Sequence, residues 1–221
     1  MEHPGDRELD DVVAGCASAH QRLLVDVDAL TDDDIFLPSL LPGWTVGHVL
    51  THLARHADSQ ILVFQAAARG EPADRYPGGM EQRVADIEAG AGRPAADQVA
   101  DLRRTIWAVE TAWAAVPADG WALTGTVMGR PEAVAELPFR RWREVEVHHA
   151  DLGRPDYTYD DWSDGYVRRE LSLAEMSWAA RRPMGLTVLP AAALAQSPAR
   201  RLAWLLGRGT IAGLEPAEPW S

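Results

Sequence analysis

The sequence predicts a mainly α protein, an up-down four-helix bundle followed by a small α/β C-terminal region. Apolar residues recur at helical spacing in four long segments. Prolines and glycines separate these segments, and helices connected in this way pack side by side in bundles. A polar stretch without periodicity, GRPDYTYDDW, then begins at Gly153 and indicates a domain boundary. We therefore expect a helical domain over residues 1–155 and a small α/β domain over residues 156–221.

The first helix is expected over residues 7–30, where Cys16 lies among the apolar positions. We expect no histidine or lysine as a near neighbour of Cys16 in the sequence, so we interpret it as a small core residue and not as a nucleophile. A loop, LPSLLPGW, follows because its prolines and glycine break a helix. The second helix is expected over residues 45–69, with Thr45 as the N-cap and Gly70 as the stop.

A turn, YPGG, leads into a short expected helix, EQRVADIEAG, and a longer helix follows over residues 95–116. The segments LTGTVMGR and AVAEL are only weakly strand-like, and we expect them to be irregular. The fourth long helix is expected over residues 138–151, with proline at the favourable first position. The C-terminal region is expected to contain a helix over 162–181, a strand in GLTVLP and a helix over 198–207.

The composition excludes several classes of partner. The formal net charge is −12, which argues against nucleic acid or an anionic membrane surface. The single cysteine rules out an internal disulfide and fits a reducing compartment. The first ten residues are polar and acidic, unlike a signal peptide, and no apolar run approaches the roughly 20 residues of a transmembrane helix. We therefore expect a cytoplasmic protein, either a monomer or a homodimer.

Five of the seven histidines fall in two of the expected helices. His48, His52 and His56 recur every four residues and share one face of the second helix. Glu144 and His148 have the same spacing in RWREVEVHHADLG, on the fourth helix. His52, Glu144 and His148 could supply the three protein ligands of a zinc site with an open position. Spacing alone leaves open a surface ion pair on one helix and an exposed polar stripe on the other.

Two motifs in order, GWTVGHVLTHLARHAD and RWREVEVHHADLG, resemble those of the mycothiol-dependent maleylpyruvate isomerase family of DinB-like four-helix metalloproteins. YPGG with Arg83 behind it, and the late LLGRG, extend the resemblance over nearly the whole chain. The resemblance implies that His52, Glu144 and His148 bind zinc or another divalent metal. It also implies that Arg83 and Arg208 hold anionic groups of the substrate or the thiol, as catalytic and cofactor-binding residues.

The other polar residues of the two motifs have less definite roles. We expect His48 to be structural, and His56 and His149 to be exposed or to support a ligand. Asp151 either orients a ligand histidine or stabilises the turn at DLG.

The resemblance implies a cis-trans isomerase of the maleylpyruvate type. The thiol mycothiol adds to the double bond of an electrophilic, carboxylate-bearing substrate, rotation follows, and elimination releases fumarylpyruvate. The lysine-free composition is compatible with an actinobacterial source. The C-terminal stretch TVLPAAALAQSPARRLAWLLGRG is shorter than the family pattern, which leaves the electrophile open. Three alternatives remain: a mycothiol S-transferase, a non-catalytic zinc-binding module, and a metal-dependent hydrolase with Glu146 or His149 as general base.

Overall fold

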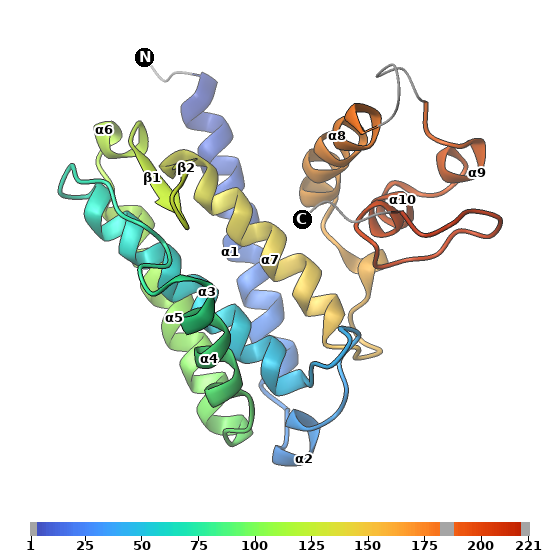
Figure 1. The fold of residues 1–221 in the computed structure, drawn as a ribbon, viewed down its shortest axis with the longest axis horizontal. Coiled ribbons are helices and arrows are strands. Elements are labelled where there is room, and N and C mark those ends of the chain that lie inside the picture. Colours follow the sequence, from blue (N-terminus) through green and yellow to red (C-terminus); the bar gives the residue numbers. More distant parts are fainter. Residues whose placement is uncertain (1–3, 182–187, 218–221) are drawn as a thin grey trace. The chain divides into compact units, whose positions relative to one another are not determined.

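The computed structural model describes residues 4–181 and 188–217, which are mostly helical (Figure 1). The chain divides into two compact units, Met1–Gly153 and Arg154–Ser221. The boundary that we expected after residue 155 lies two residues beyond this division. No helix in the described part of the chain is both long and apolar enough to cross a lipid bilayer.

The first unit is a four-helix bundle, as predicted. Its long helices are α1 (Pro4–Val27), α3 (Val46–Ala67), α5 (Ala95–Ala115) and α7 (Leu137–Asp151). The short connecting helices are α2 (Asp32–Ile35), α4 (Gly79–Ala91) and α6 (Ala118–Trp121). Helix α1 packs against α5 and α7, and α3 packs against the same two helices, so the four surround one core (Figure 1). Fully buried core residues include Leu23, Leu53, Leu102, Ile106 and Val145.

The long helices do not simply alternate in direction. The amide of Val46 donates to the carbonyl of Leu37, and the amide of Ala95 donates to the carboxylate of Asp32, so α3 and α5 both begin beside α2. These two helices therefore run parallel, and the up-down order that we expected is wrong at this connection. The cause is α4, which returns the chain to the starting end of α3 before α5 begins (Figure 1).

Two glycines allow α4 to lie directly on α3. A Cβ atom on Gly47 would collide with the carbonyl oxygen of Ala91, and one on Gly90 would collide with the side chain of Thr51. Glycine is the residue that permits backbones to approach so closely. The close packing holds α4, and with it Arg83, against the face of α3 that carries the histidines.

A β-hairpin occupies part of the segment that we expected to be irregular. Strands β1 (Thr124–Val127) and β2 (Arg130–Ala133) pair antiparallel. The two residues of the turn, Met128 and Gly129, both have positive φ, 50° and 77°. This conformation is typical of tight hairpin turns, in which glycine lowers the steric cost. Within AVAEL, Val134–Glu136 forms a 3-10 turn. The expectation of irregular structure is therefore wrong for the residues of the hairpin.

A polar cluster lies inside the bundle core. Cys16 is fully buried, as expected, and burial raises the pKa of its thiol. His20, one helical turn later, lies 3.9 Å from the sulfur, so a histidine does stand beside this cysteine. The other side chains of the cluster come from α5 and α7: Nδ1 of His20 lies 2.8 Å from Glu110 Oε1, and Arg141 Nε donates to His20 Nε2 at 3.0 Å. The cluster ties α1 to two other helices through hydrogen bonds.

His20 is expected to make stability fall in mild acid. Burial lowers the pKa of His20 to about 4, although the hydrogen bond with Glu110 opposes this, whereas an unfolded histidine titrates near 6.5. The contribution of neutral His20 to the free energy of unfolding is therefore complete above pH 6.5 and is lost as the pH falls toward 4. Between pH 7 and pH 4, the wild-type free energy of unfolding should fall by roughly 3 kcal/mol more than that of His20→Gln. Urea titrations of both proteins test this, and parallel pH profiles would contradict it.

The second unit is helical in its described residues. Its elements are a 3-10 turn (Tyr159–Asp161), α8 (Asp164–Ala180), α9 (Ala191–Leu194) and α10 (Pro198–Leu205). Helix α10 packs against α8, with the rings of Trp178 and Trp204 5.0 Å apart. Of the strand expected in GLTVLP, residues 185–187 lie outside the described residues, and residues 188–190 have no regular secondary structure.

Candidate metal centre

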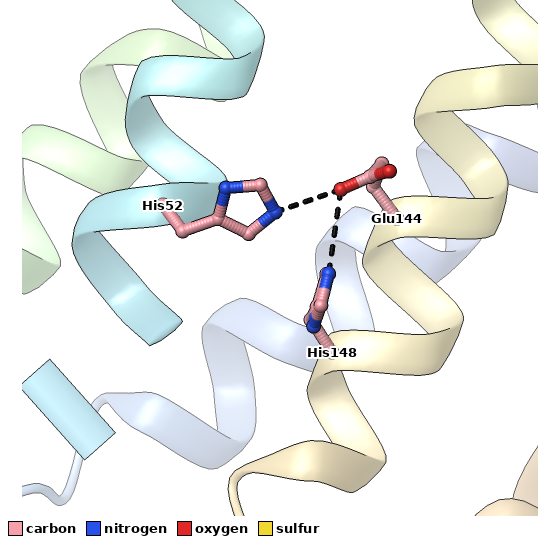
Figure 2. A group of neighbouring side chains, drawn as sticks. All are labelled: His52, Glu144 and His148. Atoms are coloured by element: carbon pink, nitrogen blue, oxygen red, sulfur yellow. Dashed lines mark hydrogen bonds and ion pairs between the residues drawn. The ribbon is translucent and has the colours of Figure 1, made fainter. Parts of the chain in front are cut away.

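Three side chains from two helices converge inside the first unit (Figure 2). His52 on α3 faces Glu144 and His148 on α7. His52 Nε2 lies 2.8 Å from Glu144 Oε2, and His148 Nε2 lies 3.4 Å from the same oxygen. One possible ligand atom from each residue lies within 4.8 Å of the other two. The packing of α3 against α7 thus joins the three residues that the sequence places on separate helix faces.

Asp151 orients His148 from the last turn of α7. Its Oδ2 lies 2.9 Å from Nδ1 of His148, and the carboxylate side chain is almost fully buried. Nδ1 is therefore engaged by Asp151, and Nε2 is the nitrogen that faces Glu144. A histidine that binds a metal almost always donates its other ring N–H to a carboxylate, a backbone carbonyl or water, and Asp151 could fill this role for His148. Of the two roles considered for Asp151, this contact supports the first.

The surroundings of the three residues shift their pKa values strongly. Burial lowers the pKa of His52 to about 4, so its ring is neutral near pH 7. Burial also acts to lower the pKa of His148, but Asp151 and Glu144 outweigh it and raise the value to about 9. Burial acts to raise the pKa of Glu144, yet the imidazoles of His56, His148 and His52 hold it well below its usual range. The carboxylate is therefore ionised, as a metal ligand must be.

The start of α3 is fixed by His48. Its Nδ1 accepts a hydrogen bond from the amide of Thr45 at 3.2 Å and lies 2.9 Å from the Thr45 hydroxyl. This contact is a capping interaction, which fits the structural role expected for His48. Trp44 lies against the rings of both His48 and His52, with centroids 6.1 and 5.5 Å apart. The GWT motif therefore positions the first turns of the helix that carries His52.

Neither His56 nor His149 is exposed. His56 is buried, with Nε2 2.8 Å from Arg75 Nη2. His149 is buried as well, and its Nε2 lies 2.8 Å from Asp26 Oδ2 on α1. Glu146 also turns toward α1, where it accepts a hydrogen bond from Arg22 at 2.9 Å. Glu146 and His149 are the two residues that we considered as general bases of a hydrolase. These contacts direct both of them toward α1 and away from the cluster.

The two arginines implied by the resemblance lie in different units. Arg83, on α4, donates from Nη2 to Nδ1 of His52 at 3.1 Å and is half-buried. Arg208 lies in the second unit, where its Nη1 donates to the carbonyl of Leu206 at 3.2 Å. The contact of Arg83 with His52 could not be inferred from spacing, because 31 residues separate the two.

Arg75 and Arg141 were not predicted from the sequence. Arg75 donates a hydrogen bond to His56, and Arg141 donates one to His20. Buried arginines leave no trace in helical periodicity, because they occupy positions that otherwise predict a solvated face.

The donor set of His52, Glu144 and His148 suits a divalent metal. Zinc accepts imidazole nitrogen and carboxylate oxygen, and catalytic sites combine three protein ligands with an open position. The side chain of His52 is only 5% exposed, whereas that of Glu144 is 27% exposed. The cluster is therefore closed on the α3 side and reachable on the side of Glu144.

Comparison with known proteins identifies the family of the chain. The family model described as the mycothiol maleylpyruvate isomerase N-terminal domain matches residues 16–153. The chain belongs to this family. The match ends where the first unit ends and contains the whole His52, Glu144 and His148 set. The family resemblance seen in the sequence is confirmed.

Solved structures show the same fold over the full length. Crystal structures of a mycothiol-dependent maleylpyruvate isomerase and of its histidine-to-alanine mutant each superpose with a TM-score of 0.81 at 22% identity. The alignments cover 99% of this chain and 98% of those chains. No curated protein sequence matches the chain significantly.

Proposed function

We propose that the protein is a zinc- and mycothiol-dependent cis-trans isomerase of the maleylpyruvate type. The observation that carries this proposal is the convergence of His52, Glu144 and His148 in a member of the isomerase family. Asp151 supports the proposal because it orients His148, a feature that a simple ion pair does not require.

The reactive thiol must come from outside the protein. Cys16 is the single cysteine of the sequence, and it lies fully buried in the bundle core with a raised pKa. A buried thiol of this kind is unreactive because the nucleophile is the thiolate. A small-molecule thiol such as mycothiol is therefore the nucleophile in the proposed reaction.

A bound metal would stabilise the thiolate form of the cosubstrate near neutral pH. His52, Glu144 and His148 would hold the metal, and Asp151 keeps His148 aligned. Thiolate addition converts the cis double bond into a single bond that can rotate. Elimination of the thiolate then restores the double bond in the trans geometry, so the thiol is regenerated and the net change is isomerisation.

The substrate needs a partner for its carboxylates and for the negative charge that develops on its carbonyl oxygen. Arg83 is the cation next to His52, and a guanidinium can bind a carboxylate through two parallel hydrogen bonds. Arg208 is proposed for the same task from the resemblance to the family. Charge stabilisation of this kind lowers the barrier of an addition that forms an enolate.

The test is a reaction of the zinc-loaded protein with maleylpyruvate in the presence and absence of mycothiol. We expect fumarylpyruvate to form only with the thiol, and activity to fall to background after chelation and to return with added zinc. A stable thioether detected by mass spectrometry would instead identify a mycothiol S-transferase. Tight zinc binding without reaction toward any electrophile would identify a non-catalytic zinc-binding module.

A further inference from the structure

The candidate metal centre lies across the boundary between two pairs of helices. Helix α1 packs extensively on α7, and α3 packs extensively on α5, whereas the contact between α3 and α7 is smaller. His52 belongs to the second pair, and Glu144 and His148 belong to the first. The distance between the two sets of ligand atoms therefore depends on an interface that is not the main packing surface of either helix.

A buried guanidinium crosses this boundary beside the centre. Arg141, on α7, is fully buried, and its Nη1 donates to the carbonyl of Leu53 on α3 at 2.7 Å. Leu53 directly follows His52 in the chain, and Arg141 precedes Glu144 by three residues, which is less than one helical turn. Hydrogen bonds from a charged donor are shorter and stronger than those between neutral groups. This bond therefore restrains the distance between α3 and α7 next to the ligands.

Other contacts fix the orientation of the guanidinium. Its Nε donates to Nε2 of His20 on α1 at 3.0 Å, and Nδ1 of the same ring lies 2.8 Å from Glu110 Oε1 on α5. The ring of His20 also stacks on Trp113, with centroids 6.0 Å apart. Because the guanidinium is planar and rigid, contacts at both Nε and Nη1 hold it in one plane. The chain of hydrogen bonds from Glu110 to the carbonyl of Leu53 thus joins all four long helices and crosses the boundary between the pairs twice.

The charge of Arg141 is not neutralised by an ion pair. Within the described residues no carboxylate lies within ion-pair distance of its guanidinium, and burying a charge without such a partner is costly. The guanidinium is nevertheless near enough to the carboxylate of Glu144 for the two charges to interact. It would therefore repel a divalent cation bound beside Glu144. The hydrogen bonds of Arg141, and not its charge, are what could favour a metal in the centre.

We infer that Arg141 is a positioning residue of the metal centre, which holds α3 at the distance from α7 at which His52, Glu144 and His148 can bind one ion. One possible ligand atom from each of the three already lies within 4.8 Å of the others. A site whose ligands are held in place binds more tightly, because less order has to be imposed on binding. The inference rests on the proposed function for the metal, and it adds which residue of the core maintains the site.

The experiment measures the zinc affinity of the full chain by competition with a chromophoric chelator. Arg141→Met should weaken zinc binding at least about tenfold, the lower end of the loss seen when a group that supports a ligand is removed. Loss of the positive charge alone would act in the opposite direction and tighten zinc binding. Leu102→Ala is the matched control, because Leu102 is fully buried on α5 and its truncation lowers stability without touching α7 or the ligands. It should retain the zinc affinity of the wild type.

A second measurement reports the geometry of the site. Cobalt(II) in place of zinc gives a visible absorption spectrum that depends on the number and arrangement of the ligands. The wild type and Leu102→Ala should share one spectrum, and that of Arg141→Met should differ. Arg141→Lys retains the charge but loses the planar fork, so it should also weaken zinc binding and change the spectrum. This variant provides the test if Arg141→Met does not fold.

The outcomes separate positioning from stability, from charge and from the metal site itself. Wild-type zinc affinity and an unchanged cobalt spectrum in the Arg141 variants would overturn the inference. An equal loss of zinc affinity in Leu102→Ala would also overturn it, because lower stability alone would then explain the effect. Tighter zinc binding by Arg141→Met would show that charge outweighs position. A wild type that binds no zinc would overturn the metal site, and with it the proposed function.

Discussion

His52→Ala is expected to abolish tight zinc binding. Loss of residues that merely support a metal ligand costs 10–100-fold in affinity, so loss of a ligand should cost more than about 100-fold. His52 is the contribution of α3 to the cluster, and without it only Glu144 and His148 on α7 remain. Metal analysis of purified protein and chelator competition both report the result.

His48→Ala is the matched control for this prediction. His48 lies one turn earlier on α3, and its Nδ1 faces Thr45. It should retain zinc and lose only about 1 kcal/mol of stability, the usual contribution of an N-terminal cap. Equal zinc content in His52→Ala and the wild type would rule out His52 as a ligand. Equal loss in both variants would point to a general disturbance of α3.

Arg141→Met is expected to lower the free energy of unfolding by about 3 kcal/mol. The guanidinium is fully buried, donating from Nη1 to the carbonyl of Leu53 at 2.7 Å and from Nε to His20 at 3.0 Å. Methionine fills similar space but removes the donor to His20 Nε2 and the second hydrogen bond to the carbonyl of Leu53, which lies inside α3. Each unsatisfied buried group costs about 1–3 kcal/mol. Urea unfolding monitored by circular dichroism measures the difference.

Arg103→Met is the control for the buried arginine. Arg103 forms a surface ion pair with Asp28, which is 66% exposed, so its replacement should change stability by less than about 1 kcal/mol. An Arg141→Met variant as stable as the wild type would mean that burying the guanidinium costs as much as its hydrogen bonds return.

The helices could be predicted from the sequence because apolar spacing and the residues at helix ends are local features. The second helix was expected over residues 45–69 and spans Val46–Ala67, since Thr45 and Gly70 mark its ends. The fourth was expected over residues 138–151 and spans Leu137–Asp151. The hairpin was missed because each strand has only four residues, too few for a period of two to stand out.

Two of the three residues of the candidate centre were likewise brought together by local spacing. Glu144 and His148 share a face because four residues make about one helical turn, and the same rule turns His149 away toward α1. That His52 faces this pair depends on the packing of α3 against α7, and His52 and Glu144 are 92 residues apart in the sequence. Spacing could therefore not distinguish a metal centre from a surface ion pair.

Local sequence thus accounts for the helices, their ends and the pairing of ligands within a helix, because each depends on neighbours within one or two turns. Tertiary packing accounts for the parallel course of α3 and α5, the burial of His56 and Arg141, and the contact of Arg83 with His52. These features depend on which helix surfaces pack against one another. That packing involves residues far apart in the chain, so local sequence does not determine it.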